Sequence, residues 1–317
     1  MNGNENIRLP EGLTIIEPPV YNWPYSTAIF AVRDEKGHTL IETGCGGPDA
    51  VEHTLSSLDS HGISAKSIHT ILVSHAHPDH FGAINKLLEA APGAEVVIHE
   101  READAAVSLE GLYRNFDFHL AGKYTGSSGP QLDSVIDVFK FNIFKKECQA
   151  GSRAPHRTAK AGEVTEAGPL RLRWVLTPGH SPGHIAFHDE KSGVLFSGDL
   201  VGRNPAWYAP AAGGVTGYLA SLDAISALEP ALLLPSHSPP VADPQAAISD
   251  VRDNLMKREE RILDLLSRGE ADFKRVVDEL FASHFTIFPG SPIIECHLQK
   301  LIGEEKVVEE NGKYRLV

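Results

Sequence analysis

The stretch ILVSHAHPDHF, residues 71–81, joins an apolar run to a dense group of side chains that bind metal ions. Residues 70–73 have the length and composition of a buried strand, and residues 81–90 have the spacing of a helix. Four metal-binding side chains lie between them: His75, His77, Asp79 and His80. On a loop leaving a strand, His75 and His77 can converge on one ion while Asp79 and His80 turn toward a second point. The stretch therefore favours a site for two ions.

Three further side chains follow predicted strands later in the chain: His180, Asp199 and His237. Because loops at strand ends gather functional groups, we expect these three to complete the site. Imidazole and carboxylate donors without thiolate favour zinc, and manganese or iron accept the same donors. Two zinc ions about 3.5 to 4 Å apart, with Asp199 between them, would activate a water molecule as a nucleophile at neutral pH.

Residues 74–80 (SHAHPDH) resemble the HxHxDH signature of the metallo-β-lactamase superfamily. Residues 177–184 (TPGHSPGH) resemble the third motif of that superfamily, and residues 197–199 (SGD) and 235–237 (PSH) complete the resemblance. It extends over about residues 13–243. The resemblance implies an α/β protein, an αββα sandwich with the metal ions at one edge of its two sheets.

The resemblance also implies a role for each motif residue. One ion would be held by His75, His77 and His180, and the other by Asp79, His80 and His237, with Asp199 bridging the two. Asp79 would also act in catalysis, because it can orient the nucleophile or relay its proton. His184, from the third motif, would support a loop or a ligand by hydrogen bonding instead of binding metal.

Two positions depart from the pattern of the superfamily. Glu42 stands where aspartate is common, and Ser236 precedes His237 where glycine is usual. Neither change removes a ligand, so we expect altered support of the site and retained activity.

The chain is long enough for one large domain and a smaller one. Residues 1–243 form the predicted catalytic domain, in which about residues 103–162 are expected to be an inserted helical cap. A long helix, two shorter helices and two strands are predicted next, so residues 244–317 read as a helical linker and a winged-helix domain. This tail resembles that of β-lactamase-like 2 proteins.

Aromatic residues near the predicted site favour a small, partly apolar substrate. Trp207 and Tyr208 follow Asp199 in a loop that would supply an aromatic wall and a phenol donor to an oxyanion. Aromatic residues of the cap would enclose an apolar chamber if they face the metal ions. We therefore expect hydrolysis of an ester-like bond in a lactone, a carboxylic ester or a thioester.

Composition restricts the partners and the location. The formal net charge of -13 disfavours nucleic acid, and residues 270–317 carry six Lys and Arg residues against nine Asp and Glu residues. Cys45, Cys148 and Cys296 are odd in number and far apart, so we expect free thiols in a reducing cytosol. No apolar run approaches the roughly 20 residues of a membrane span, and residues 1–9 lack a signal-peptide pattern. We expect a cytoplasmic protein whose cap and tail offer surfaces for a homodimer.

Three other functions stay open at this point. A phosphodiesterase or ribonuclease uses two metal ions in the same way, although the acidic composition disfavours it. An iron oxidoreductase of the flavodiiron type would usually carry glutamate in place of His77. The third is a non-enzymatic protein whose winged helix binds DNA while its metal domain senses a ligand, because fold and function separate readily.

Overall fold

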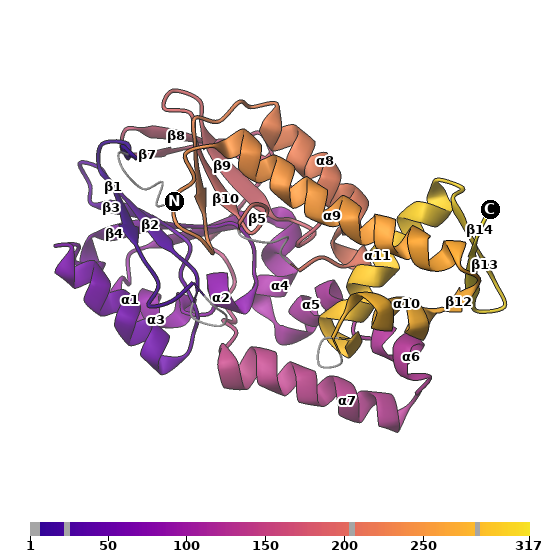
Figure 1. Ribbon diagram of the computed structural model, residues 1–317. Helices are drawn as coiled ribbons and strands as arrows, with labels where there is room; N and C mark the ends of the chain where they lie inside the picture. The colour runs from indigo at the N-terminus through magenta and orange to yellow at the C-terminus, as the bar shows by residue number, and fades with distance from the viewer. Residues whose placement is uncertain (1–6, 22–25, 203–206, 283–285) are drawn as a thin grey trace.

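The computed structural model describes residues 7–21, 26–202, 207–282 and 286–317, and it contains two large β-sheets with helices outside them (Figure 1). The first sheet has the order β1-β2-β3-β4-β5-β6. Its strands are β1 (Leu13–Ile16), β2 (Ile29–Arg33), β3 (His38–Ile41), β4 (Ile68–Val73), β5 (Glu95–His99) and β6 (Arg157–Ala159). The first three strands pair antiparallel, as predicted, and the later ones pair parallel.

The second sheet has the order β11-β10-β9-β8-β7. Its strands are β7 (Val164–Ala167), β8 (Leu170–Leu176), β9 (Ile185–Asp189), β10 (Val194–Gly198) and β11 (Leu232–Pro235). Strands β10 and β11 pair parallel, as β4 and β5 do in the first sheet. Parallel strands end at the same edge of a sheet, so the segments that follow them can meet there.

Three apolar layers hold the sandwich together. The middle layer fills the space between the sheets, where the rings of Phe30 and Phe196 meet edge to face with their centroids 5.1 Å apart. Two outer layers lie under the covering helices, which are α1 (Pro48–Ser60), α3 (Ile84–Ala90), α8 (Gly214–Ser226) and α9 (Pro244–Ser267). Because both of its faces are covered, the second sheet buries β9 and β10 along their whole length. The predicted fold class is confirmed.

The helix predicted at residues 81–90 is two helices, α2 (Pro78–Phe81) and α3. Asp79 and His80 therefore lie on a helical turn of their own. Gly82 follows α2 and packs closely, because a Cβ atom there would lie 2.5 Å from Gly46 N and 2.6 Å from Gln149 O. Backbone atoms of Gly46 and Gln149 thus pack against the end of α2, the turn that carries Asp79 and His80.

The inserted segment is helical, as its spacing predicts, but it ends earlier than expected. Its helices are α4 (Ala103–Val107), α5 (Leu109–Tyr113), α6 (Leu120–Thr125) and α7 (Pro130–Phe141). Residues 157–159, which fall inside the predicted cap, instead form β6 and pair with β5. This pairing satisfies the backbone groups on the open side of β5, which the cap would otherwise leave unpaired.

The C-terminal elements form a small unit with a core of its own. After α9 come β12 (Ala271–Asp272), α10 (Phe273–Leu280), α11 (Ser291–Gly303), β13 (Val307–Glu310) and β14 (Lys313–Leu316). The three strands pair in the order β12-β14-β13. The sequence predicts the helices and the last two strands, while β12 is too short to be seen in it. Among the described residues, no helix combines the length and apolarity needed to cross a membrane.

Cys45 and Cys148 form a disulfide, with their Cα atoms 5.5 Å apart and a separation of 103 residues in the sequence. The prediction of free thiols is therefore wrong for these two residues, and Cys296 alone is free. The bond joins the loop after β3 to the end of the cap. Since disulfides persist mainly in oxidising environments, the cysteines no longer support a reducing cytosol.

Reduction of this disulfide should destabilise the protein. A bond that closes a loop of this length restricts the unfolded chain and contributes about 2–5 kcal/mol to the free energy of unfolding. We expect a lower denaturant midpoint for the unaltered protein in dithiothreitol, and no effect of dithiothreitol on the C45S/C148S variant. Titration of the unreduced, denatured protein should find a single thiol, that of Cys296. A result of three thiols would contradict the bond.

Candidate metal centre

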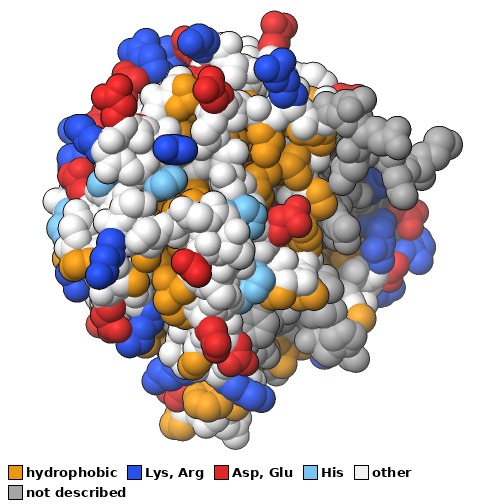
Figure 2. Space-filling view, turned by 90° about the vertical axis from the view of Figure 1, so that its left-hand side faces the viewer, with side chains coloured by type: hydrophobic (Ala, Val, Ile, Leu, Met, Phe, Trp, Pro, Cys, Tyr) orange, Lys and Arg blue, Asp and Glu red, His pale blue; other side chains and the backbone are white. Residues whose placement is uncertain are grey.

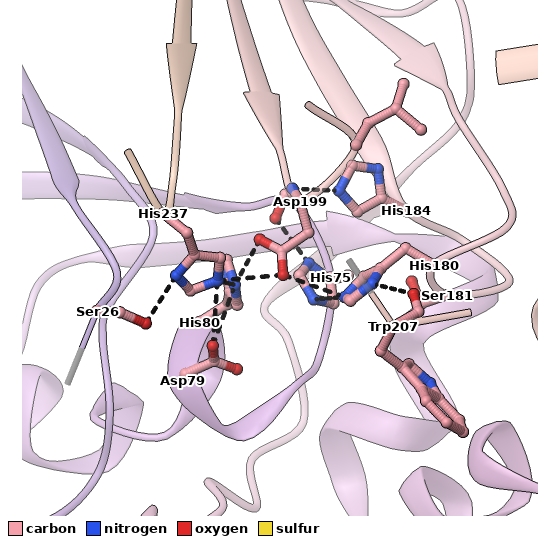
Figure 3. A network of polar contacts seen from close by, with 12 residues as sticks. Ser26, His75, Asp79, His80, His180, Ser181, His184, Asp199, Trp207 and His237 are labelled. Carbon is pink, nitrogen blue, oxygen red and sulfur yellow. Dashed lines mark hydrogen bonds and ion pairs between the residues drawn. The ribbon is translucent and has the colours of Figure 1, made fainter. Parts of the chain in front are cut away.

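The seven predicted ligands come together in two groups at the shared edge of the sheets. Ligand atoms of His75, His77 and His180 lie within 4.8 Å of one another, and those of Asp79, His80, Asp199 and His237 do the same. Figure 3 shows His80 and His237 on one side of the Asp199 carboxylate and His75 and His180 on the other. The ligands come from the ends of β4, β10 and β11, from α2 and from the loop between β8 and β9.

The carboxylate of Asp199 contacts both groups. Its Oδ2 atom lies 3.3 Å from His180 Nε2 and 3.1 Å from His237 Nε2. Its Oδ1 atom lies 2.9 Å from His80 Nε2. This is the arrangement expected of a carboxylate that bridges two ions.

The spacing of the donor atoms fits divalent metal ions. The Nε2 atoms of His75 and His180 face each other at 3.0 Å, and those of His80 and His237 at 3.2 Å. Tetrahedral ligands about 2.0–2.1 Å from zinc lie about 3.3 Å apart, which is close to these distances. His77 Nε2 is buried and has no hydrogen-bond partner among the described residues, so a cation would satisfy it.

The other ring nitrogen of three ligands is held by an oxygen atom of the protein. His180 Nδ1 donates to the backbone oxygen of Trp207 at 2.7 Å. The Nδ1 atom of His237 lies 2.8 Å from the Ser26 hydroxyl, and that of His75 lies 2.9 Å from the Ser74 hydroxyl. Such partners fix the ring orientation and leave Nε2 for the metal.

His184 lies beside the ligands with both of its ring nitrogens engaged. Its Nδ1 is 2.7 Å from the Thr177 hydroxyl, and its Nε2 accepts the backbone N–H of Asp199 at 3.1 Å. A Cβ atom at Gly198 would lie 2.5 Å from that Nε2, so glycine is needed for the close approach. His184 is thus placed where it can support the backbone of Asp199, and its supporting role stays a prediction.

Burial and neighbouring groups shift the imidazole pKa values in opposite directions. Burial, reinforced by the other imidazoles, lowers the pKa of His75 and His77 well below the usual range. Burial would lower the pKa of His237 as well, but Asp199 and Asp79 outweigh it and raise the pKa to about 10. The pKa of His80 is raised by the same two carboxylates. In the metal-free protein the second group therefore holds a proton near neutral pH.

A match to the family model described as "Metallo-beta-lactamase superfamily" covers residues 22–237 and includes every one of these ligands. The chain belongs to this superfamily. Its relatives include the probable metallo-hydrolase YqjP of Bacillus subtilis, 26% identical over 90% of this chain and 91% of YqjP. The human acyl-coenzyme A thioesterase MBLAC2 is 25% identical over 61% of this chain and 64% of its own length.

Solved structures extend the likeness to the whole fold. The metallo-β-lactamase family protein TTHA1429 of Thermus thermophilus has a TM-score of 0.77 and 22% identity, covering 98% of this chain and 100% of TTHA1429. A β-lactamase domain protein of Burkholderia ambifaria has a TM-score of 0.76 and 22% identity, covering 98% of this chain and 94% of its own. The cap and the C-terminal unit are thus part of a fold that these superfamily members share.

Two buried glutamates support the ligands from behind. Glu42, at a φ of 71°, places its carboxylate 3.4 Å from His80 Nδ1, where it can orient that ring. Glu102 accepts hydrogen bonds from Ala76 N at 3.0 Å and from Gly183 N and the Ser181 hydroxyl at 2.7 Å each. Glu102 therefore joins the loop of His75 and His77 to the loop of His180. The sequence analysis missed it, although it follows β5 at the same edge of the sheet.

The two predicted substrate-binding residues take different positions. The Trp207 ring lies beside the ligands, stacked on Phe116 with the centroids 5.5 Å apart. The Tyr208 side chain is fully buried on the side of α9 and α11, where its hydroxyl contacts His297 Nε2 at 2.9 Å and Arg258. The prediction of Tyr208 as a phenol donor to an oxyanion is therefore wrong, because its hydroxyl is already paired away from the site.

Metal binding should release protons and should tighten as the pH rises. His237, with a pKa of about 10, must lose its proton before Nε2 can bind an ion. We expect the affinity of the metal-free protein for zinc to increase from about pH 6 to pH 8. Calorimetry in two buffers of different ionisation enthalpy measures the released protons, and equal heats in both would contradict the expectation.

Glu102→Gln should weaken metal binding without unfolding the protein. The amide keeps the size of the side chain, but its nitrogen cannot accept a hydrogen bond, so one loop loses its support. Substitutions behind metal ligands cost about 10-fold to 100-fold in metal affinity or activity. Glu100→Gln, at an exposed position two residues away, is the matched control. Equal zinc affinities for the two variants would show that Glu102 does not position the ligands.

Proposed function

We propose that the protein is a dinuclear zinc hydrolase that cleaves an ester-like bond, with thioesters favoured over lactones and carboxylic esters. The observation that carries the proposal is the pair of ligand groups that share the Asp199 carboxylate. Manganese and iron fit the same donors. The name of the human relative, an acyl-coenzyme A thioesterase, supports the thioester class.

Each residue of the site has a defined task in this proposal. Two divalent ions bound here would lower the pKa of a water molecule and polarise the carbonyl oxygen of the substrate. The Asp79 carboxylate lies 3.2 Å from His237 Nε2 and 3.6 Å from His80 Nε2. From there it orients the attacking water and accepts its proton. His184 holds the backbone of Asp199 and thereby fixes the bridging carboxylate.

The C-terminal unit supports a small-molecule substrate over nucleic acid. We propose that it is a winged helix in which α11 takes the position of the recognition helix, the helix that DNA-binding members insert into the major groove. Here α11 packs on α8 and α6, and it buries Ile294, His297, Leu298 and Leu301. A helix buried in this way cannot enter a groove of DNA.

The surface charge agrees with that choice. On the face shown in Figure 2, basic and acidic side chains are interspersed and form no continuous basic stripe among the described residues. With a net charge of -13, the protein repels phosphate backbones. Nucleic-acid cleavage and DNA sensing are therefore the disfavoured alternatives, while a homodimer and a cytoplasmic location stay predictions.

His77→Ala and Asp199→Ala test the proposed function. Each variant should lose bound zinc, and kcat/KM should fall by about 10²-fold or more, because the ions supply several kcal/mol of transition-state stabilisation. The substrates are an acyl thioester, a lactone, a p-nitrophenyl ester and a phosphodiester, and His61→Ala, at an exposed histidine, is the control. Full zinc content with unchanged rates would refute the site, and turnover of the phosphodiester alone would refute the substrate class.

A further inference from the structure

A continuous set of aromatic rings begins at a metal ligand and ends in the C-terminal unit. We call this set the aromatic wall, and it consists of Phe116, Phe118, Trp207 and Phe288. The Phe116 ring lies 4.9 Å from the ring of His77. Trp207 stacks on Phe116 at 5.5 Å and on Phe288 at 4.5 Å. Phe288 also stacks on Phe118 at 5.4 Å.

Three separate parts of the chain build the aromatic wall. Phe116 and Phe118 belong to the cap, and Trp207 lies in the segment between β10 and α8. Phe288 lies directly before α11, yet it packs on the apolar layer of the catalytic domain and cap instead of the core of its own unit. The C-terminal unit therefore contributes one ring to the aromatic wall, in contact with Trp207 and Phe116.

The wall leaves apolar surface accessible at one end. Phe116 and Phe118 are only 5% and 8% exposed, whereas Trp207 and Phe288 are half-buried. The indole N–H of Trp207 is inaccessible to solvent and has no hydrogen-bond partner among the described residues. A ligand against the exposed parts of the Trp207 and Phe288 rings would gain apolar contact.

Contacts between the cap and the C-terminal unit hold Phe288 in place. Lys123 of α6 forms an ion pair with Glu295 of α11 at 2.8 Å, and its ammonium group lies 4.9 Å from the centre of the Phe273 ring. The Tyr124 hydroxyl donates to Asp278 at 2.7 Å. Figure 1 shows α10 and α11 beside the cap helix α6. Phe288 is thus a fixed part of the site wall.

We propose that Phe288 and Trp207 recognise the apolar acyl group of the substrate, so that the C-terminal unit sets the preference for acyl chain length. This inference rests on the proposed hydrolysis of an ester-like bond. The backbone oxygen of Trp207 accepts from His180 Nδ1 at 2.7 Å, so an acyl carbonyl at the metal centre would place its chain near Trp207. Each methylene buried against the rings contributes about fourfold to binding.

Phe288→Ala in the full-length, zinc-loaded protein tests the inference with acetyl, butanoyl and octanoyl thioesters. We expect kcat/KM for the octanoyl thioester to fall by about tenfold or more, mainly because KM rises. For the acetyl thioester, kcat/KM should change less than about threefold. For Phe288→Leu, which retains apolar bulk, kcat/KM for the octanoyl thioester should lie between the values of the unaltered protein and Phe288→Ala. Phe141→Ala, at a cap residue that is 55% exposed, is the matched control.

Equal losses for all three thioesters, or no loss for any, would overturn the inference. Thermal unfolding of each variant separates loss of folding from loss of recognition. A second readout does not require turnover: calorimetric binding of octanoate and acetate to the same proteins. Weaker binding of octanoate to Phe288→Ala, with acetate unchanged, supports the inference even if no thioester is cleaved, and in that case the proposed function alone fails. Equal binding of octanoate to the unaltered protein and to Phe288→Ala overturns the inference.

Discussion

The carboxylate of Asp199 ties the two sheets of the sandwich together at the metal edge. Asp199 follows β10 of the second sheet, and its oxygens reach His80, which follows β4 of the first sheet, as well as His237 and His180. The Tyr218 hydroxyl donates to the backbone oxygen of Asp199 at 3.0 Å. A buried carboxylate is costly unless it is paired. The imidazoles from both sheets supply that pairing, and they add a polar link to the apolar layer between the sheets.

The supporting residues follow from the same constraint. A metal-binding imidazole usually donates its other ring N–H to a protein group, which fixes the orientation of the ring. Here this is done by short side chains and backbone atoms at fixed positions, such as Ser26 for His237 and the Trp207 oxygen for His180. Glu102 holds two loops with a single carboxylate, which is possible only because burial excludes competing water. These groups therefore connect the loops that carry the candidate ligands.

The ligands could be predicted from the sequence, whereas much of their surroundings could not. His75, His77, His180 and His237 stand in local motifs after apolar strands, and strand ends meet at an edge by the rules of sheet pairing. Tyr208 is adjacent to Trp207, yet a difference of one residue turns its side chain to the opposite side, and only tertiary packing decides which. The pairing of Cys45 with Cys148 spans 103 residues and depends on close backbone packing near Gly46 and Gly82. No local pattern carries such information.

The C-terminal unit illustrates why an element order does not define a function. Its helices and strands follow the order of the predicted winged helix, but α11 packs against α8 and α6. The same packing fixes the segment that precedes α11 and so brings Phe288 to Trp207. The unit thus contributes one ring to the aromatic wall beside the candidate metal centre. The contacts of α11 lie in the catalytic domain, at α8, and in the cap, at α6. A role for the unit has to be inferred from these contacts, because the order of its elements alone does not define one.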